Sequence, residues 1–278
     1  MTETPDTMAK LYMQTSLRDT ICMSFIFKDN DKVMVFDGGY PFEYPNLYSR
    51  LKEIGCEIDT WFITHPHDDH MGGFVELMER YGDEFKIHNL CFNFISYDLM
   101  EQHAMHDAVN SIPLIERMNK IIDKYNINLI TAKKGDVYKI GNSTVKCLRE
   151  PNTSITREIF NNSSIVLRLD SNGKSILFLG DLTTEGGEEL LEICDPNEIK
   201  CDYVQMAHHG QGGVEKNVYK VISPDYCLWC TPTWLWDNIG ENGYDTNKFR
   251  TIIVRGWMSE IKVKKHYLNM NGNVEIDI

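Results

Sequence analysis

Three histidines and two aspartates fall within residues 65–70, His-Pro-His-Asp-Asp-His, directly after an apolar segment. In an extended backbone, residues two apart point the same way, so His65 and His67 can bind one metal ion together. Asp69 and His70 lie past a bend, where a Gly-Gly pair starts a helix, and can face a neighbouring ion. Imidazoles with few carboxylates and no thiolate are the ligands expected around a catalytic zinc or similar ion with an open coordination position. A solvated polar loop is the alternative, and this density of ligands disfavours it.

Further candidates stand at the ends of other apolar segments. Asp181 follows the predicted strand 175–179, and His208 and His209 follow the predicted strand 203–207. The ends of neighbouring strands converge at the edge of a sheet, so these side chains could join the histidine motif. Taken alone, an aspartate after a strand is usually a turn residue. His209 could be a ligand, or a proton donor to the leaving group if His208 is the ligand, and the sequence leaves this choice open.

These segments together resemble a known family. HPHDDHMGG is similar to the H-x-H-x-D-H signature of the metallo-β-lactamase-fold hydrolases. Asp37 in VMVFDGG, Asp181 in SILFLGD and AHHGQGG at 207–213 stand in the order of that family's other motifs. NNSSIVLRL at 161–169 and the doubled histidine resemble the ComEC-type branch, which includes the soluble domain of the competence DNA-uptake protein and bacterial phosphorylcholine esterases. The resemblance covers about residues 20–275.

The resemblance implies two metal positions bridged by one aspartate. The metal ligands that it implies are His65, His67, Asp69, His70, Asp181 and His208. The two aspartates among them and His209 are the residues expected to act in catalysis. Behind the ligands, Asp37 is expected to hydrogen-bond a ligand imidazole and fix its tautomer, with Asn162 as a further residue of this outer layer.

The chain departs from the commonest members of the family at the ion held by His65 and His67. Those members have a further histidine before the bridging aspartate, whereas residues 151–164 contain none here. Two asparagines and two serines occupy positions 161–164, as in the ComEC-type branch. Amide and hydroxyl oxygens are poor replacements for imidazole on zinc, even if Asn162 helps. We therefore expect this ion to bind more weakly than its neighbour.

The elements that position these residues form two successive blocks of strands and helices. They do not alternate as regular βαβ units, so two sheets packed face to face with helices outside are expected. This is an α+β fold, a four-layer αββα sandwich, and residues 1–278 are expected to form one domain. The predicted strands are 21–27, 32–36, 60–64, 87–95, 137–140, 144–148, 164–169, 175–179, 203–207, 226–229, 261–267 and 274–276. The predicted helices are 47–54, 72–81, 112–125, 188–193 and 218–222.

The composition is that of a folded protein, because 42% of the 278 residues are hydrophobic and 25% are charged. A net charge of −13 gives no broad basic surface, so extended nucleic-acid binding is not expected. The sequence shows no membrane span and no signal peptide, so a cytoplasmic location without membrane contact is expected. The eight cysteines are expected to be reduced, with Cys227 and Cys230 as structural residues.

For two other groups of residues, a functional role is possible but a structural or surface role is commoner. His103 and His106 share a face if their segment is helical, and they could belong to a lid over the site, although surface histidines are commoner. Most tryptophans belong to a core, and the alternative is an aromatic platform that contacts a quaternary ammonium group. The tryptophans concerned are Trp229, Trp234, Trp236 and Trp257.

The expected activity is hydrolysis with one or two divalent ions, zinc first and manganese as the alternative. A metal-bound water would lose a proton near neutral pH, and the hydroxide would attack a small anionic substrate, a phosphodiester or related phosphoester by the branch resemblance. An amide, lactam or thioester hydrolase of the same fold is the alternative, and a non-catalytic binding protein is the third possibility. A di-iron oxygen-reducing enzyme is disfavoured, because that related branch has an acidic residue where His67 stands. The natural substrate and the oligomeric state stay open.

Overall fold

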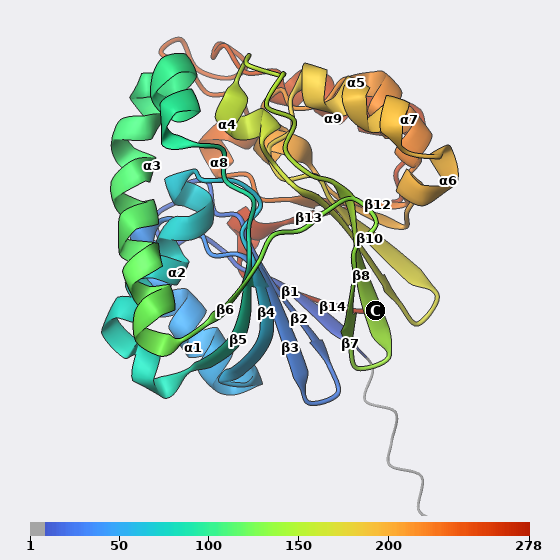
Figure 1. Cartoon of the computed structure of the whole chain (residues 1–278). Coiled ribbons are helices and arrows are strands. Elements are labelled where there is room, and N and C mark those ends of the chain that lie inside the picture. Colours follow the sequence, from blue (N-terminus) through green and yellow to red (C-terminus); the bar gives the residue numbers. More distant parts are fainter. Residues whose placement is uncertain (1–8) are drawn as a thin grey trace, which may run out of the picture.

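Two β-sheets lie face to face, each covered on its outer side by helices, in the computed structural model of the chain (Figure 1). The structure describes residues 9–278. The helices of the first half of the chain cover one sheet, and all helices of the second half except the short segment 159–162 cover the other. The four-layer αββα sandwich predicted from the sequence is therefore confirmed.

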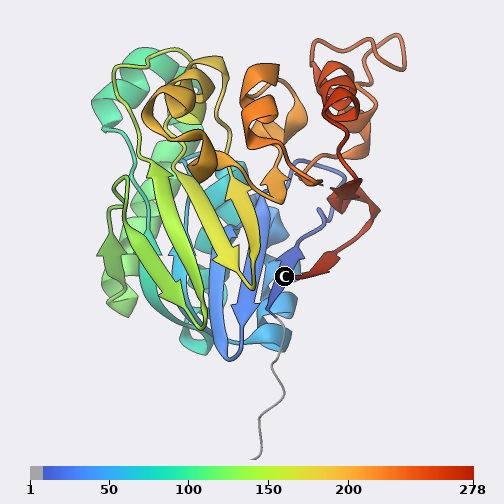
Figure 2. The ribbon, with the colours of Figure 1, turned by 90° about the vertical axis from the view of Figure 1, so that its right-hand side faces the viewer.

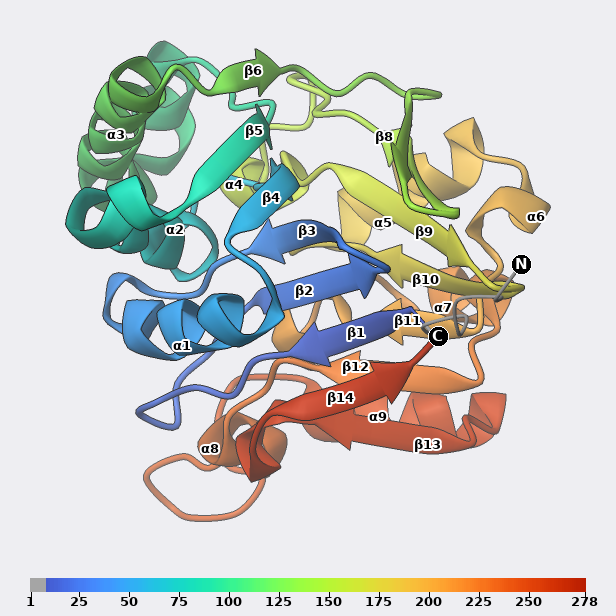
Figure 3. The same ribbon diagram turned by 90° about the horizontal axis from the view of Figure 1, so that it is seen from below.

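The first sheet combines the N-terminal half of the chain with the last strand. Its strands in spatial order are β14 (Val274–Asp277), β1 (Lys10–Met13), β2 (Ser24–Asp29), β3 (Lys32–Asp37), β4 (Glu57–Phe62), β5 (Lys86–Cys91) and β6 (Asn128–Ile130). Its helices are α1 (Tyr44–Ile54), α2 (Asp68–Tyr81) and α3 (Tyr97–Tyr125). Strands β3 to β6 run parallel to one another. Figures 2 and 3 show β14, in red, beside β1, in blue.

The second sheet comes from the C-terminal half. Its strands in spatial order are β13 (Lys265–Leu268), β12 (Tyr226–Trp229), β11 (Tyr203–Gln205), β10 (Lys174–Phe178), β9 (Val166–Ser171), β8 (Ser143–Arg149) and β7 (Val137–Ile140). Its helices are α5 (Thr184–Ile193), α6 (Pro196–Ile199), α7 (Lys216–Ile222), α8 (Thr233–Trp236) and α9 (Thr251–Ile261). The short helix α4 (Ile159–Asn162) packs instead against α3, in the outer core of the first sheet. Strands β10 to β13 run parallel.

Apolar side chains fill three layers of core. Between the sheets, Phe36 of β3 stacks on Phe178 of β10 with ring centroids 4.3 Å apart, and on Phe62 of β4 at 5.2 Å. An outer core that includes Met118 of α3 joins the first sheet to its helices, and one that includes Leu190 of α5 does so for the second sheet. Strands packed on both faces are rigid supports, so side chains at their ends are held in fixed places.

The short helices α4, α6 and α8 were not predicted, and the larger differences from the sequence-based prediction concern α2, α3 and α9. Helix α2 begins at Asp68 and not at Gly72, four residues early. The first half of α3 was not predicted, because residues 97–111 are mostly polar and carry a weak apolar periodicity. Helix α9 occupies residues 251–261, so β13 begins at Lys265 and not at residue 261 as predicted. The β-branched Ile-Ile-Val run of α9 does not favour a helix locally, which is why this helix was not predicted.

The carboxyl ends of four strands meet at one edge of the sandwich. β3 ends at Asp37 and runs parallel to β4, which leads into the histidine motif. In the other sheet, β10 leads to Asp181 and runs parallel to β11, which leads to the doubled histidine. The backbone N–H of Ile165 donates to the carbonyl of Thr64 at 3.0 Å and ties the two sheets together at this edge.

The described residues include neither a membrane-spanning helix nor a disulfide bond. Across residues 9–278, none of the helices is both long and apolar enough to cross a membrane. All eight cysteines are free thiols, and Cys227 and Cys230 are buried in the core, which fits a structural role.

Candidate metal centre

The histidine motif turns the chain from β4 into α2. His67 stands at the N-cap of α2 in an extended backbone, with φ −76° and ψ 153°, so His65 and His67 precede the helix. Asp69 and His70 lie in its first turn. The predicted bend before the glycines is thus the start of the helix itself, and Asp69 is at the end where a helix favours negative charge.

Glycines let α2 approach the loop that follows β3. The N–H of Gly73 donates to the carbonyl of Gly39 at 2.8 Å, and the N–H of Gly38 donates to the carbonyl of His70 at 2.6 Å. A Cβ on Gly73 would overlap the carbonyl oxygen of Gly38. The close approach requires glycine, and it fixes the place of His70 beside Asp37.

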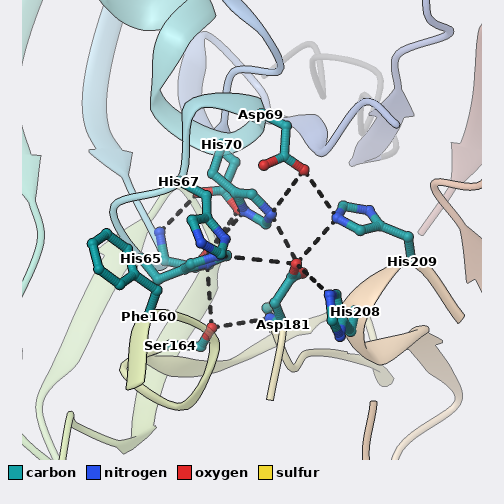
Figure 4. A network of polar contacts seen from close by, with 12 residues as sticks. His65, His67, Asp69, His70, Phe160, Ser164, Asp181, His208 and His209 are labelled. Carbon is teal, nitrogen blue, oxygen red and sulfur yellow. Dashed lines mark hydrogen bonds and ion pairs between the residues drawn. The ribbon is translucent and has the colours of Figure 1, made fainter. Parts of the chain in front are cut away.

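Four buried side chains converge at the N-terminal end of α2 (Figure 4). Their ligand atoms lie within 4.8 Å of one another, and the four are Asp69, His70, Asp181 and His209. His209 Nε2 lies 3.0 Å from Asp69 Oδ2 and 3.1 Å from Asp181 Oδ2. His70 Nε2 lies 3.3 Å from Asp181 Oδ1. Two imidazoles and two carboxylates arranged in this way can hold one divalent ion.

A second group shares Asp181 with the first. The ligand atoms of His65, His67 and Asp181 also lie within 4.8 Å of one another. His65 Nε2 lies 2.9 Å from His67 Nδ1 and 3.9 Å from Asp181 Oδ2. Asp181 therefore lies between two groups of ligands. The structure brings the predicted ligands of the 65–70 motif and Asp181 together at one centre.

The two adjacent histidines of segment 207–213 differ in their distance from the ligand groups. His209 is completely buried in the four-residue group, whereas His208 lies at its edge, 20% exposed, with Nε2 4.0 Å from Asp181 Oδ2. Both residues have a left-handed backbone, with φ 50° and 54°, which is strained for a side chain other than glycine. The resemblance implied His208 as the ligand and the sequence left the choice open, whereas the structure places His209 in the four-residue group, because this turn directs the second histidine inward.

Asp37 holds one ligand imidazole from behind. Its Oδ2 lies 2.9 Å from Nδ1 of His70 and accepts the hydroxyl of Thr64 at 2.8 Å, while its Oδ1 accepts the backbone N–H of Thr64, also at 2.8 Å. These contacts leave Nε2 of His70 facing the four-residue group, as expected for an outer partner of a metal ligand. Asp37 has a positive φ of 56°, so its backbone is also strained at this position.

Ser164, which the sequence did not single out, performs the same task for the other group. Its Oγ lies 3.3 Å from Nδ1 of His65 and accepts the backbone N–H of Asp181 at 2.9 Å. Arg149, fully buried, donates to the carbonyl of Ser164 at 2.8 Å and pairs with Glu189 at 2.6 Å. The only sequence signal for Ser164 was its place in the 161–164 segment.

Asn162 lies behind the centre and not at an ion position. Its side-chain oxygen accepts the backbone N–H groups of Thr183 and Gly186, each at 3.1 Å. Its amide group donates to the carbonyl of Arg157 and to the hydroxyl of Thr183. Asn162, which was expected in the outer layer, therefore holds the loop between Asp181 and α5.

Burial and neighbouring charges set the protonation of the centre. Burial raises the pKa of Asp69, but His70 and His209 outweigh this effect and lower it to about 2. Burial lowers the pKa of His209, but Asp181 and Asp69 raise it to about 9. For His65, burial and the charge of His70 both lower the pKa. Without a metal ion, the four-residue group holds protons near pH 7, which a bound cation would displace.

Buried polar atoms at this centre have no hydrogen-bond partner within the described part of the chain. They include Nε2 of His70, Oδ1 of Asp181 and both ring nitrogens of His209. Nε2 of His70 and of His209 lie near carboxylate oxygens, at 3.0–3.3 Å, but without the geometry of a hydrogen bond. Buried polar atoms without partners are unfavourable unless another species binds them. Nitrogen and oxygen ligands without sulfur match zinc and are also compatible with manganese. The residues therefore fit one or two divalent ions.

A pocket of about 320 Å³ opens over the two groups. It is lined by Ile21, Tyr40, His67, Asp68, Asp69, His106, Asp107, Asn110, Asp181, His208, His209 and Gln211. Of the two lid candidates, His106 lines this pocket and His103 does not. Trp229 is fully buried and packs edge-on against Trp236 in the outer core of the second sheet, which favours the structural interpretation of these tryptophans.

Comparisons with known proteins identify the family. The family described as the metallo-beta-lactamase superfamily matches residues 17–214. ComE operon protein 3 of Bacillus subtilis (strain 168) is 26% identical over 157 residues, which are 56% of this chain and 18% of that protein. The chain thus spans less than a fifth of the length of this curated relative.

Solved structures agree on the fold. The metallo-beta-lactamase fold protein YhfI from Bacillus subtilis is 13% identical, with a TM-score of 0.59 and coverage of 96% of this chain and 99% of that one. CmlA, a diiron beta-hydroxylase from Streptomyces venezuelae, is 12% identical, with a TM-score of 0.58 and coverage of 99% and 55%.

The chain belongs to the metallo-β-lactamase superfamily. Its similarity to ComE operon protein 3 supports the ComEC-type branch that the sequence motifs indicate. Its cluster of histidines and aspartates is of the kind that metal-dependent hydrolases of this superfamily use.

Proposed function

We propose that this protein hydrolyses a small phosphodiester or related phosphoester with two divalent ions, zinc being the expected metal. The observation that carries the proposal is the position of Asp181 between two groups of ligands. Ions bound there would supply positive charge for an anionic substrate and would lower the pKa of a bound water toward neutrality. The similarity to ComE operon protein 3 supports the branch on which the choice of a phosphodiester rests.

The side chains around the pocket favour a substrate of low negative charge. Asp68 and Asp107 line it in addition to the ligands, and none of its described lining residues is a lysine or arginine. A phosphodiester carries one negative charge near pH 7, whereas a phosphomonoester carries nearly two. Repulsion from the two carboxylates therefore opposes the monoester more than the diester. The same acidity opposes long nucleic-acid substrates.

His208 and Tyr40 are suited to donate hydrogen bonds to the oxygens of a substrate. Burial lowers the pKa of His208, so its imidazole is neutral near pH 7 and donates one N–H. Burial raises the pKa of Tyr40, so its hydroxyl stays protonated. Both residues line the pocket. A neutral His208 is better suited to stabilise charge on a phosphoryl oxygen than to donate a proton to a leaving group.

A substrate panel tests the proposal. Purified protein loaded with zinc or manganese is assayed with an aryl phosphodiester, an aryl phosphomonoester, an aryl thioester and a chromogenic cephalosporin. The phosphodiester should be turned over fastest, and Asp181→Ala should lose this activity. Turnover of the cephalosporin or the thioester without turnover of the phosphodiester would favour acyl hydrolysis. Tight metal binding without any turnover would favour a binding protein.

A further inference from the structure

Each imidazole at the centre has two nitrogens, and a metal ligand uses only one. The outward nitrogen usually meets a carboxylate, a carbonyl or a water that fixes the ring. For His70 the outward Nδ1 meets Asp37 at 2.9 Å, and for His65 the outward Nδ1 meets Ser164 at 3.3 Å. His67 is turned the other way, because its Nδ1 lies 2.9 Å from His65 Nε2 and so faces the ion position. Its outward nitrogen is therefore Nε2.

The Nε2 atom of His67 is buried and has no hydrogen-bond partner within residues 9–278. Asp107 Oδ1 lies 3.8 Å from it, roughly 1 Å beyond a hydrogen bond. The opposite side of the ring is supported by Phe160 of α4, whose ring lies parallel within 10° at a centroid distance of 5.2 Å. Figure 4 shows this stacking of His67 and Phe160. The ring is thus held on its face, while Asp107 is the carboxylate placed at its outer edge.

The helix that carries Asp107 is broken before this residue and contains a proline after it. Ala104 has non-helical angles, with φ −152° and ψ 52°, and Pro113 lies inside α3. A proline has no N–H to donate and displaces the carbonyl four residues before it. Segment 105–112 therefore lies between the break at Ala104 and the proline at 113. Ala108 and Ser111 anchor it in the core, while His106, Asp107 and Asn110 line the pocket.

We propose that Asp107 is the positioning residue of His67: its carboxylate accepts the Nε2–H, which leaves Nδ1 unprotonated toward the ion shared with His65. The inference rests on the metal centre proposed above. The hydrogen bond between Asp107 and His67 would also link the pocket wall to the metal, because it would bring segment 105–112 closer to the centre. Binding of an ion at His65 and His67 and docking of this segment then stabilise each other.

Another role for Asp107 is an ion pair with its neighbour His106, whose ring nitrogen lies 3.4 Å away. The His106 side chain is 95% exposed, and exposed pairs of this kind contribute little. This pair gives no reason for Asp107 to influence metal binding. The two roles therefore predict different results in a metal titration.

The test is a calorimetric titration of metal-free protein with zinc, in wild type and in Asp107→Ala and Asp107→Asn. The control is Glu101→Gln, which removes one negative charge from an exposed position of the same helix before the break. His67→Ala should remove zinc binding at the position of His65 and His67, and so shows which of the two titration steps belongs to that site. We expect Asp107→Ala to weaken one of the two sites by about 10–100-fold and the other by less than about threefold. Asp107→Asn, whose amide oxygen still accepts a hydrogen bond, should lose less, and Glu101→Gln should match wild type.

A double variant and hydrogen exchange complete the test. Adding Asp107→Ala to His67→Ala should leave the remaining site unchanged, because the two residues act on the same ion. Zinc should protect the amides of segment 105–112 in wild type and not in Asp107→Ala. Two wild-type sites in Asp107→Ala, or equal weakening of both, would overturn the role of Asp107 while leaving the metal centre intact. Failure of wild-type protein to bind zinc or manganese would overturn the metal centre itself.

Discussion

Oδ2 of Asp181 lies 3.1 Å from Nε2 of His209, which joins the end of β10 to the left-handed turn that follows β11. The same carboxylate oxygen lies 3.9 Å from Nε2 of His65, on the opposite sheet. One side chain thus connects ligands from both halves of the sandwich. A two-ion centre in this fold depends on that position.

Removal of Asp181 should therefore affect both ions. In Asp181→Ala, zinc affinity should fall roughly 100-fold or more at both sites, a larger loss than that of an outer-layer residue. Hydrolysis should be lost with it. Asp68→Asn is the control, because Asp68 lines the pocket but belongs to neither group of ligands. Metal content and activity are measured on the same preparations, and equal losses in both variants would contradict the assignment.

The two adjacent histidines should behave differently when each is replaced by alanine. His209→Ala should lose the ion held by Asp69 and His70, because His209 belongs to that group. His208→Ala should retain both ions and lose turnover, since it lies at the pocket edge. Elemental analysis after dialysis separates the two cases. Loss of metal in His208→Ala with retention in His209→Ala would instead identify His208 as the ligand, as the family resemblance implied.

Metal binding should be strongly dependent on pH. Asp181 and Asp69 outweigh burial and raise the pKa of His209 to about 9 in the metal-free protein, and the pKa of His70 is also raised. A zinc ion must displace these protons, so its affinity should rise roughly tenfold per pH unit for each proton released, up to about pH 9. Calorimetry at pH 7.5 in two buffers with different ionisation enthalpies counts the protons. Binding without proton release would contradict these protonation states.

The stability of the metal-free protein should depend on pH through the protonation of His209. Because the folded pKa of His209 lies above the unfolded value of about 6.5, its contribution is fully present below pH 6.5. The contribution is lost as the pH rises through about 9. The melting temperature of metal-free protein should therefore fall between these values, whereas that of metal-loaded protein should fall less. Thermal denaturation followed by circular dichroism measures both.

The close contact between α2 and the loop after β3 should be intolerant of a single methyl group. Gly73→Ala would overlap the carbonyl oxygen of Gly38, so the free energy of unfolding should fall by about 3 kcal/mol. Metal affinity should fall as well, because the shift moves Asp69 and His70. Gly256→Ala is the matched control: it lies in α9 with open space around it, and it should stabilise the protein by up to about 1 kcal/mol. Urea denaturation compares the two, and a tolerated Gly73→Ala would show that the loop can move.

The sequence predicted the fold and most of the residues that the structure brings together at the centre, because those signals are local. The spacing within residues 65–70 and the strands before Asp37 and Asp181 depend on neighbouring residues in the chain. The choice between His208 and His209 was not predictable in this way, because it depends on a strained turn fixed by tertiary packing. The role proposed for Asp107 was not predictable either, since Asp107 lies in the first half of α3, whose position depends on the break at Ala104.

The structure also gives a reason to expect different metal affinities at the two ion positions. The group that includes His209 offers four ligands, and the group that includes His67 offers three. His208 at the pocket edge does not belong to the smaller group. Partial removal of zinc with a chelator should therefore empty the His65 and His67 position first.

The most direct test of the two-ion centre is a crystal structure of zinc-loaded protein with anomalous diffraction measured on both sides of the zinc absorption edge. Two zinc peaks are expected, one among Asp69, His70, Asp181 and His209 and one among His65, His67 and Asp181, with the Asp181 carboxylate between them. A single peak without contact to Asp181, or peaks at other residues with this centre empty, would contradict the account.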